Sequence, residues 1–162
     1  MLDVTSISAI VAAAGVLVGV FYYILDMRHQ KQERKKDLVI ELASKFVGKE
    51  FLEAFVNVYD AEFRDYDEFA RKYGKLFSKS EVSISFMIMG NFFEQIGVLL
   101  RNRLIDSSLI DQLVPVVMVW EKMKPFVEEA RKVYDEPKLW EWFEYLYDEI
   151  KKREQKLQKS KA

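Results

Sequence analysis

The feature that most constrains this chain is an uncharged run of 22 residues near its N-terminus, Val4–Leu25. Its only ionisable side chains are the hydroxyls of Tyr22 and Tyr23, which stay neutral near pH 7. At about 1.5 Å per residue, a helix of this length reaches roughly 33 Å and matches a hydrocarbon core of about 30 Å. The run therefore predicts a single transmembrane helix over residues 4–25.

Two alternative interpretations of this run are a cleaved secretory signal and the buried core helix of a soluble domain. A secretory signal has basic residues before a shorter apolar core, whereas the only charged side chain before this run is Asp3. If the run were a buried core helix, the concentration of basic residues on its C-terminal side alone would have no explanation. The sequence therefore favours the membrane span over both alternatives.

Basic residues follow the run directly and indicate how it crosses the membrane. Residues 27–36 hold five basic side chains against Glu33, and residues 1–26 hold no Lys or Arg. Because basic residues concentrate on the cytoplasmic side, we expect a single-pass cell-membrane protein with its N-terminus outside and its C-terminal domain in the cytoplasm. The lipid bilayer is then its first partner. The predicted membrane-surface contacts are Tyr22, Tyr23, Arg28, Lys31, Arg34, Lys35 and Lys36.

The rest of the chain is acidic until its C-terminal end, which is basic. Residues 37–150 carry 14 basic and 22 acidic side chains, and residues 151–162 carry six basic side chains and one acidic. An acidic body repels phosphate, and no aromatic residue lies between the basic residues at either end, so we expect no nucleic-acid partner. Residues 151–162 are predicted to form a basic flexible tail.

Apolar residues recur at spacings of three and four through residues 38–150, which indicates helices rather than strands. No Gly or Pro lies between Val20 and Val47, so the membrane helix is expected to continue through residues 26–37 as a basic juxtamembrane stalk. We therefore predict an all-α fold. It consists of one N-terminal transmembrane helix, this stalk, and a small cytoplasmic helical bundle of about five segments at residues 38–150.

Turn and capping residues divide this domain into its segments. Gly48 and Gly74 are expected helix ends, because glycine is the usual residue just beyond a helix C-terminus. A helix is expected to open at Asp65. Ser78 and Glu81 have the spacing of a capping box, in which each side chain bonds a backbone amide of the first turn, and they predict the start of the longest helix of the domain.

Three prolines give further boundaries. Pro115 lacks a backbone donor in the middle of an apolar stretch, so it predicts a kink or a restart there. Pro125 and Pro137 are each predicted to lie in the first turn of a helix, where the missing amide costs least.

Small residues form one face of the predicted membrane span. Gly15 and Gly19 give the G-x-x-x-G spacing, and Ser8 and Ala12 extend the same face. Small residues let two helix backbones approach closely in lipid, so this face predicts self-association or packing against another membrane protein.

Glu94 is the most unusual charge of the domain, because it lies within the largely apolar stretch Phe92-Phe93-Glu94-Gln95-Ile96. A partly buried carboxylate either fixes helix packing as an ion pair or acts as a general base or ligand-binding acid with a raised pKa. No companion His, Cys or second carboxylate converges on it in the sequence, which favours the structural role. The candidate members of the ion pair are Glu94, Arg101 and Arg131.

The residue types that most enzyme and metal sites need are scarce. The chain holds no Cys and one His, which excludes thiolate sites and makes a Ser-His-Asp triad improbable. No Gly-rich phosphate loop, H-E-x-x-H, E-x-x-H or G-x-S-x-G motif occurs. We therefore expect no catalytic residue, no cofactor and no metal.

A distinctive set of residues occupies about the middle third of the chain. It comprises Phe92-Phe93-Glu94-Gln95-Ile96-Gly97, then Arg101-Asn102-Arg103-Leu104-Ile105-Asp106, then Trp120. This set resembles an uncharacterised family of short prokaryotic proteins with one N-terminal membrane helix and a cytoplasmic helical domain of unknown function. The resemblance implies the same anchored, all-α architecture, and it implies no catalytic residue, cofactor or substrate.

Together these observations predict a membrane-tethered cytoplasmic interaction module or scaffold. It either forms a homo-oligomer or serves as a subunit of a membrane complex. The alternative is a membrane-anchored small-ligand sensor or an unrecognised hydrolase, with a pocket between helices near Glu94.

Overall fold

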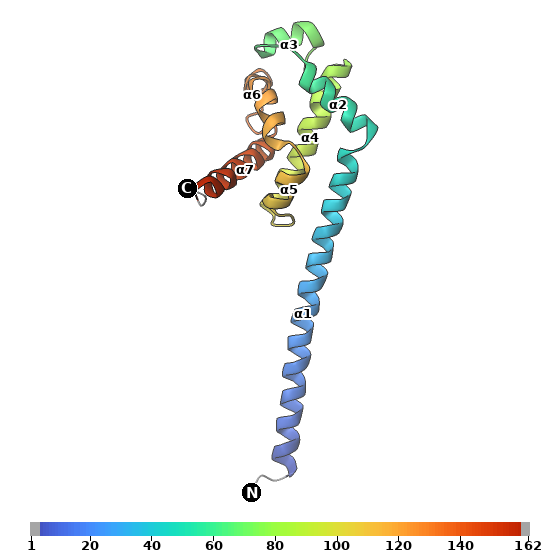
Figure 1. The fold of residues 1–162 in the computed structure, drawn as a ribbon, viewed down its shortest axis with the longest axis vertical. Helices are drawn as coiled ribbons and strands as arrows, with labels where there is room; N and C mark the ends of the chain where they lie inside the picture. Colours follow the sequence, from blue (N-terminus) through green and yellow to red (C-terminus); the bar gives the residue numbers. More distant parts are fainter. Residues whose placement is uncertain (1–3, 160–162) are drawn as a thin grey trace. The chain divides into compact units, whose positions relative to one another are not determined.

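The computed structural model describes the backbone of residues 4–159 and the side chains of residues 16–159. This described part holds seven helices and no strand, so the predicted all-α fold is confirmed (Figure 1). The chain divides into two compact units, one up to Leu38 and one from Val39. The helices are α1 Val4–Phe46, α2 Lys49–Asp60, α3 Tyr66–Tyr73, α4 Glu81–Arg101, α5 Ser107–Leu113, α6 Val116–Val133 and α7 Glu141–Lys159.

The first unit is the part of α1 up to Leu38. The helix runs through residues 26–37 without a break, as the absence of Gly and Pro predicts. Exposed bonds between side chains one turn apart support it, such as the 2.7 Å ion pair between Lys36 Nζ and Glu33 Oε1. Residues 26–37 are therefore continuous helix, and their role as a juxtamembrane stalk stays a prediction.

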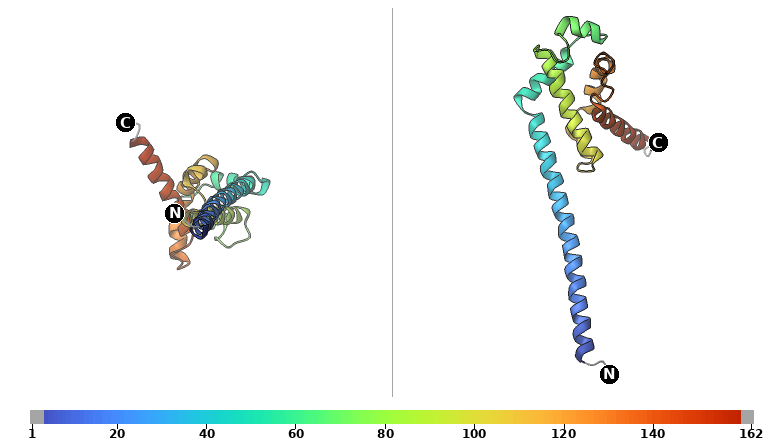
Figure 2. Two further views of the ribbon diagram at one scale, coloured as in Figure 1. Left: turned by 90° about the horizontal axis from the view of Figure 1, so that it is seen from below. Right: turned by 180° about the vertical axis from the view of Figure 1, so that it is seen from behind.

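The second unit is built around α4. This helix contacts α2, α3 and α7, and Figures 1 and 2 show it running between α2 and α7. Helix α6 contacts α2, α3 and α7 and completes the core. The rings of Phe69, Phe86 and Phe126 meet there with centroids 4.5–4.8 Å apart. Each such pair adds about 1 kcal/mol to the stabilisation from burial.

The end of α1 belongs to this second unit. Val39, Leu42 and Ala43 line a small apolar cavity together with residues of α4 and α5. The ring of Phe46 lies 5.0 Å from that of Phe51 on α2. These apolar residues at the end of α1 therefore pack on the domain core.

Local capping explains the next two helices. The backbone turns at Gly48 between α1 and α2, as predicted. Asp65 begins α3, and its carboxylate accepts a 2.8 Å hydrogen bond from the amide of Glu68. Gly74 ends α3 with φ of +87°, a conformation that other residues rarely adopt.

The predicted start of α4 is wrong by two residues. The residue that caps α4 is Ser80, whose hydroxyl accepts a 3.2 Å bond from the amide of Ser83. Ser78 instead closes the preceding turn, because its amide bonds the carbonyl of Lys75 at 2.9 Å. Ser78 and Glu81 therefore do not form a capping box, since the helix begins only at Glu81.

The prolines give one confirmed and two wrong predictions. Helix α5 ends at Leu113 and α6 begins at Val116, so Pro115 marks the expected restart. Pro125 lies inside α6 rather than in a first turn, and Pro137 lies in the turn that precedes α7. The apolar residues on both sides of Pro125 form one buried face, and their burial offsets the cost of about 3 kcal/mol for a proline inside a helix.

Helix α7 extends further than the sequence indicates. It continues to Lys159, so most of the predicted flexible tail is helical. A 2.5 Å ion pair from Arg153 Nη1 to Asp111 Oδ2 fixes the middle of this segment to α5.

Candidate functional site

Two glycines of α4 let the start of α7 approach closely. A Cβ atom on Gly90 would lie 2.2 Å from the ring of Trp140, and one on Gly97 would lie 2.0 Å from the carbonyl oxygen of Trp142. Neither position accepts a larger residue without a shift of the chain. We call this contact the α4–α7 seam: Gly90, Asn91, Glu94 and Gly97 on α4, with residues 139–143.

Trp140 is the central residue of the seam. It is 5 % exposed, and its indole Nε1 donates a 3.0 Å hydrogen bond to Asn91 Oδ1. Its backbone has φ of +53°, which costs a bulky residue free energy and persists only where surrounding contacts impose it. The ring packed over Gly90 and the bond to Asn91 are those contacts.

Glu94 supplies the cap that α7 lacks. Trp140 precedes the first residue of α7, and its side chain has no oxygen to accept a bond from the first turn. The carboxylate of Glu94 accepts a 2.9 Å bond from the amide of Phe143 instead. A negative charge is also favoured at the positive end of the helix dipole. A side chain of α4 thus fixes where α7 begins.

Burial raises the pKa of Glu94 above its ordinary value, because the half-buried carboxylate is costly to charge. The amides of Phe143 and Trp142 act in the opposite direction, since they bond the charged form. The negative charge of Glu141 raises the pKa further, and the positive charge of Arg131 lowers it. Desolvation outweighs these bonds.

Arg131 holds the other side of the seam. Its Nε donates a 3.0 Å bond to the carbonyl of Leu139, and its Nη1 lies 2.7 Å from Glu144 Oε2. Its Nη2 is buried and bonds no described residue. The structure thus brings Glu94 and Arg131 to one seam but joins Arg131 to Glu144, and Arg101 lies exposed in the last turn of α4.

The sequence singles out Glu94 but misses its partners. Trp140, Gly90 and Gly97 are the residues that make the seam, and Glu94 bonds a backbone amide that no sequence pattern marks. One signal was available: two glycines seven residues apart lie on the same face of a helix and permit close approach of another backbone.

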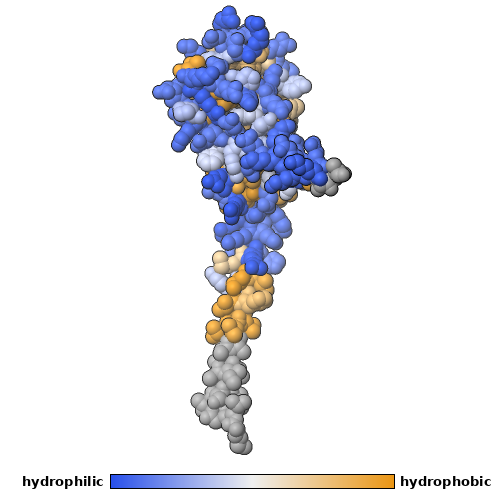
Figure 3. Space-filling model, turned by 90° about the vertical axis from the view of Figure 1, so that its left-hand side faces the viewer, coloured by the Kyte–Doolittle hydropathy of each residue, from blue (hydrophilic) through white to orange (hydrophobic). Residues whose placement is uncertain are grey.

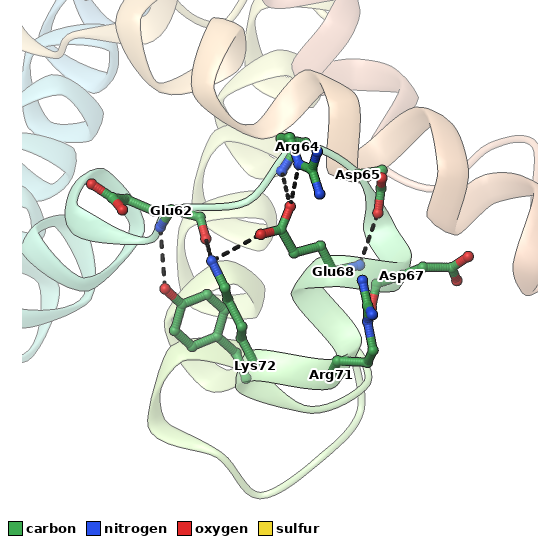
Figure 4. Close-up of polar contacts among 8 residues, drawn as sticks. Glu62, Arg64, Asp65, Asp67, Glu68, Arg71 and Lys72 are labelled. Atoms are coloured by element: carbon green, nitrogen blue, oxygen red, sulfur yellow. Dashed lines mark hydrogen bonds and ion pairs between the residues drawn. The ribbon is translucent and has the colours of Figure 1, made fainter.

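A second cluster of charges lies around α3 (Figure 4). Glu68 accepts bonds from the amide and the Nε of Arg64, at 3.1 and 2.9 Å, and pairs with Lys72 Nζ at 2.9 Å. These donors lower the pKa of Glu68 to about 2. Lys72 also bonds the carbonyl of Glu62 at 3.0 Å, so the cluster ties the loop before α3 to the helix.

Neither cluster has the composition of a metal centre. Across the described residues, no three His, Asp or Glu side chains gather in a way that fits a metal ion. The expectation that the chain uses no metal and no cofactor stays a prediction. An open groove of about 480 Å³ beside the seam is lined by Glu128, Arg131, Lys132, Asp135 and Pro137.

The predicted membrane segment is described only in part. Of its small-residue face, Ser8, Ala12 and Gly15 lie outside the residues whose side chains are described, and Gly19 has open space around its Cα. The large apolar side chains from Val16 to Leu25 are 41–73 % exposed. Figure 3 shows a hydrophobic band at this part of α1.

The predicted membrane-surface residues also lie on α1. Tyr22 and Tyr23 are 73 % and 62 % exposed. Four of the five basic residues are exposed as well, and Lys35 is half-buried. The exposed ones are Arg28, Lys31, Arg34 and Lys36.

One helix within the described residues is long and apolar enough to cross a membrane by length and composition, and it is α4. Half of its apolar stretch is buried inside the domain, as expected for a core helix. Residues 4–15 lie outside this comparison, so it leaves the predicted span over residues 4–25 untested.

Comparison with known proteins identifies the family of the chain. Neither the curated proteins nor the solved structures include a match to it. A family model described as a domain of unknown function, DUF4760, matches residues 9–150, which include α2 to α6 and the whole α4–α7 seam. This confirms the resemblance to an uncharacterised family. The chain belongs to the DUF4760 family.

Proposed function

We propose that this chain is a membrane-tethered interaction module, held by the N-terminal part of α1 and making protein contacts through its helical domain. The observation that carries the proposal is the exposure of every large apolar side chain from Val16 to Leu25. A helix that is apolar on all sides is stable when lipid or protein covers it and unfavourable when water surrounds it.

The charges next to this segment support the proposed orientation. Arg28, Lys31, Arg34 and Lys36 are exposed within three turns of Leu25. Each basic residue close to anionic headgroups gains about 1 kcal/mol. With these residues on the cytoplasmic side, the domain from Val39 onward lies in the cytoplasm and the N-terminus outside.

An interaction role fits the chemistry of the domain better than catalysis does. Glu94, the one candidate acid or base, is occupied by the backbone of α7, and its partners stabilise the fold. The alternative of a small-ligand sensor or hydrolase requires a pocket that reaches Glu94. A small molecule that stays with the purified chain and is displaced by Glu94→Gln would favour this alternative.

The first experiment tests the anchor. Membranes from cells that express the full chain are washed with alkaline carbonate and floated on a density gradient. We expect the chain to float with the membranes, and Val18→Arg to release it. Val133→Arg is the matched control, because it places the same charge at an exposed valine of α6. A wild-type chain that remains in the soluble fraction would overturn the proposal.

The second experiment tests orientation and self-association. The chain has no cysteine, so a single cysteine near either end reports its side of the membrane through an impermeant maleimide. We expect labelling of intact cells at Leu2→Cys and none at Ala162→Cys. Gly15→Ile with Gly19→Ile should weaken association if the small-residue face pairs two spans.

A further inference from the structure

Helix α7 continues beyond the last residue that it packs on the domain core. The spacings of three and four place its buried residues in one line along the helix, and these are Phe143, Leu146 and Ile150. The next position on this line is Arg153, whose Nη1 pairs with Asp111 of α5. We call residues 155–159 the α7 tip. All of them are exposed, and Figures 1 and 2 show this end of α7 projecting from the other helices of the second unit.

The α7 tip carries positive charge that its own chain does not neutralise. The three basic residues just before the tip each pair with a carboxylate. In contrast, Lys156 and Lys159 are exposed, and no carboxylate among the described residues pairs with either of them. In the sequence no acidic residue follows Glu154, and Lys161 adds a third positive charge. The tip is therefore basic, at the end of a domain whose residues 37–150 carry more acidic than basic side chains.

Uncompensated positive charge indicates an anionic partner, which is a nucleic acid, an acidic protein surface or an anionic membrane. The acidic residues of the domain repel a nucleic acid, and the tip has no aromatic side chain for a base to stack on. An acidic protein has to reach the tip by diffusion, whereas the proposed anchor already holds the chain at lipid. The membrane is therefore the favoured partner.

The length of the tether keeps the tip close to the membrane. Residues 26–38 separate the proposed span from the domain, and as a helix they extend about 21 Å. Helix α7 has 19 residues and is about 28 Å long, so it is comparable in length with the tether. A tethered group has a high local concentration at the surface, so weak attraction is enough to hold it there. Leu157 lies between the two lysines, and its 45 % exposed side chain suits the boundary between headgroups and acyl chains.

We propose that the α7 tip is a second membrane contact, in which Lys156 and Lys159 bind the anionic headgroups of the leaflet that faces the domain. This rests on the proposed function, because the anchor brings the tip to lipid. Each lysine close to an anionic surface strengthens attachment about fivefold, and salt screens this attraction. The contact therefore forms and breaks with the charge of the lipid, and it holds the domain to the membrane through α7 as well as through α1.

The full chain reconstituted in lipid nanodiscs tests this contact. Two compositions are compared, phosphatidylcholine alone and equal parts of phosphatidylcholine and phosphatidylserine. The chain has no cysteine, so Gln158→Cys places a single fluorescent dye on the tip. We expect the uncharged quencher acrylamide to quench this dye several-fold less in discs that contain phosphatidylserine. Raising the salt from about 0.1 M to about 1 M shortens the screening distance from roughly 10 Å to 3 Å and should remove this protection.

Matched variants test which charges make the contact. Lys156→Gln with Lys159→Gln, made in the Gln158→Cys chain, should lower the ratio of bound to free tip about 25-fold and so abolish the protection. Lys124→Gln with Lys138→Gln removes two exposed lysines elsewhere on the domain and should leave the protection unchanged. A dye at Glu136→Cys, in the exposed turn before α7, should be quenched equally in both compositions.

The outcomes separate this contact from the anchor. A chain that enters both kinds of disc but is quenched equally at residue 158 overturns the contact and leaves the anchor in place. If that equal quenching is weak in both compositions, a protein surface rather than lipid covers the tip. A chain that remains outside discs of either composition overturns the anchor and, with it, this contact.

Discussion

Glu68 beside α3 and Glu94 in the α4–α7 seam both accept hydrogen bonds from backbone amides, yet their pKa values move in opposite directions. The side chain of Glu68 is 16 % exposed and has two cationic partners, Arg64 and Lys72, which lower its pKa to about 2. Glu94 is half-buried and has its backbone donors alone within bonding distance, so burial raises its pKa. The difference teaches that amide donors alone compensate only part of the desolvation of a carboxylate, whereas two cationic partners outweigh it and lower the pKa.

The largest expected effect comes from closing the space that the seam needs. Gly97→Ala places a methyl group against the carbonyl of Trp142, so α7 has to move away from α4. We expect a loss of about 3 kcal/mol in the free energy of unfolding, measured by denaturant titration. Gly48→Ala is the control, because the backbone of Gly48 is not strained and the new Cβ atom would lie 3.2 Å from the carbonyl oxygen of Lys45. Equal losses would show that the close approach at Gly97 does not matter.

Removing the arginine of the seam should have the next largest effect. Arg131→Met keeps most of the side-chain volume but leaves the carbonyl of Leu139 without its bond and Glu144 without its ion pair. We expect destabilisation of about 2 kcal/mol, measured by thermal unfolding. Lys132→Met removes a neighbouring exposed pair with Glu129 and should change little. A small effect of Arg131→Met would mean that the turn before α7 keeps its conformation without the bonds from Arg131.

The two functions of Glu94 can be separated by two variants. Glu94→Ala removes the acceptor of the Phe143 amide and should cost about 1 kcal/mol, as loss of a helix cap does. Glu94→Gln keeps an oxygen acceptor and removes the charge that burial penalises, so it should match or exceed the wild type at pH 7. Thermal unfolding checks both.

The direction of the pKa shift of Glu94 determines how the stability difference between Glu94→Gln and the wild type depends on pH. The pKa of Glu94 is higher in the folded state, so the folded chain binds more protons, and this residue lowers stability as pH rises above 4.5 through the folded pKa. The advantage of Glu94→Gln should therefore shrink toward pH 4. A difference that grows on acidification would contradict the burial of this carboxylate.

Glu68 should show the opposite pH dependence and the smallest effect. Its pKa is lowered to about 2, so its contribution is present above its ordinary pKa of 4.5 and is lost as pH falls toward 2. Glu68→Gln should therefore destabilise the chain slightly at pH 7 and not at pH 2. The effect is small because water screens Arg64 and Lys72, the two exposed cations that pair with Glu68. Glu53→Gln, in a looser 3.5 Å pair with Lys49, is the control.

Local sequence signals were enough for several helix boundaries. Asp65, Gly74 and Pro115 act on the residues next to them, and each marks the boundary that its chemistry predicts. Gly48 also lies at a boundary, but its φ of −63° is one that any residue adopts. Pro125 misled because its local preference for a first turn is weaker than the burial of the apolar face on which it lies. Tertiary packing decided that case.

The seam shows where sequence reasoning stops. Glu94 stands out as a charge in an apolar run, but its partner is a backbone amide 49 residues away that any residue at that position would provide. The positive φ of Trp140 has no sequence signal either, because tryptophan is among the residues least expected there. Long-range contacts between unlike groups leave no periodic pattern to read.

The cap on α7 has a consequence for how the chain folds. The side-chain cap of this helix resides on α4, so α7 gains its cap only when α4 is in place. We expect the amides of the first turn of α7 to gain protection from hydrogen exchange later than those of α4 during refolding. The formation of helix α7 therefore depends on the earlier folding of another part of the domain.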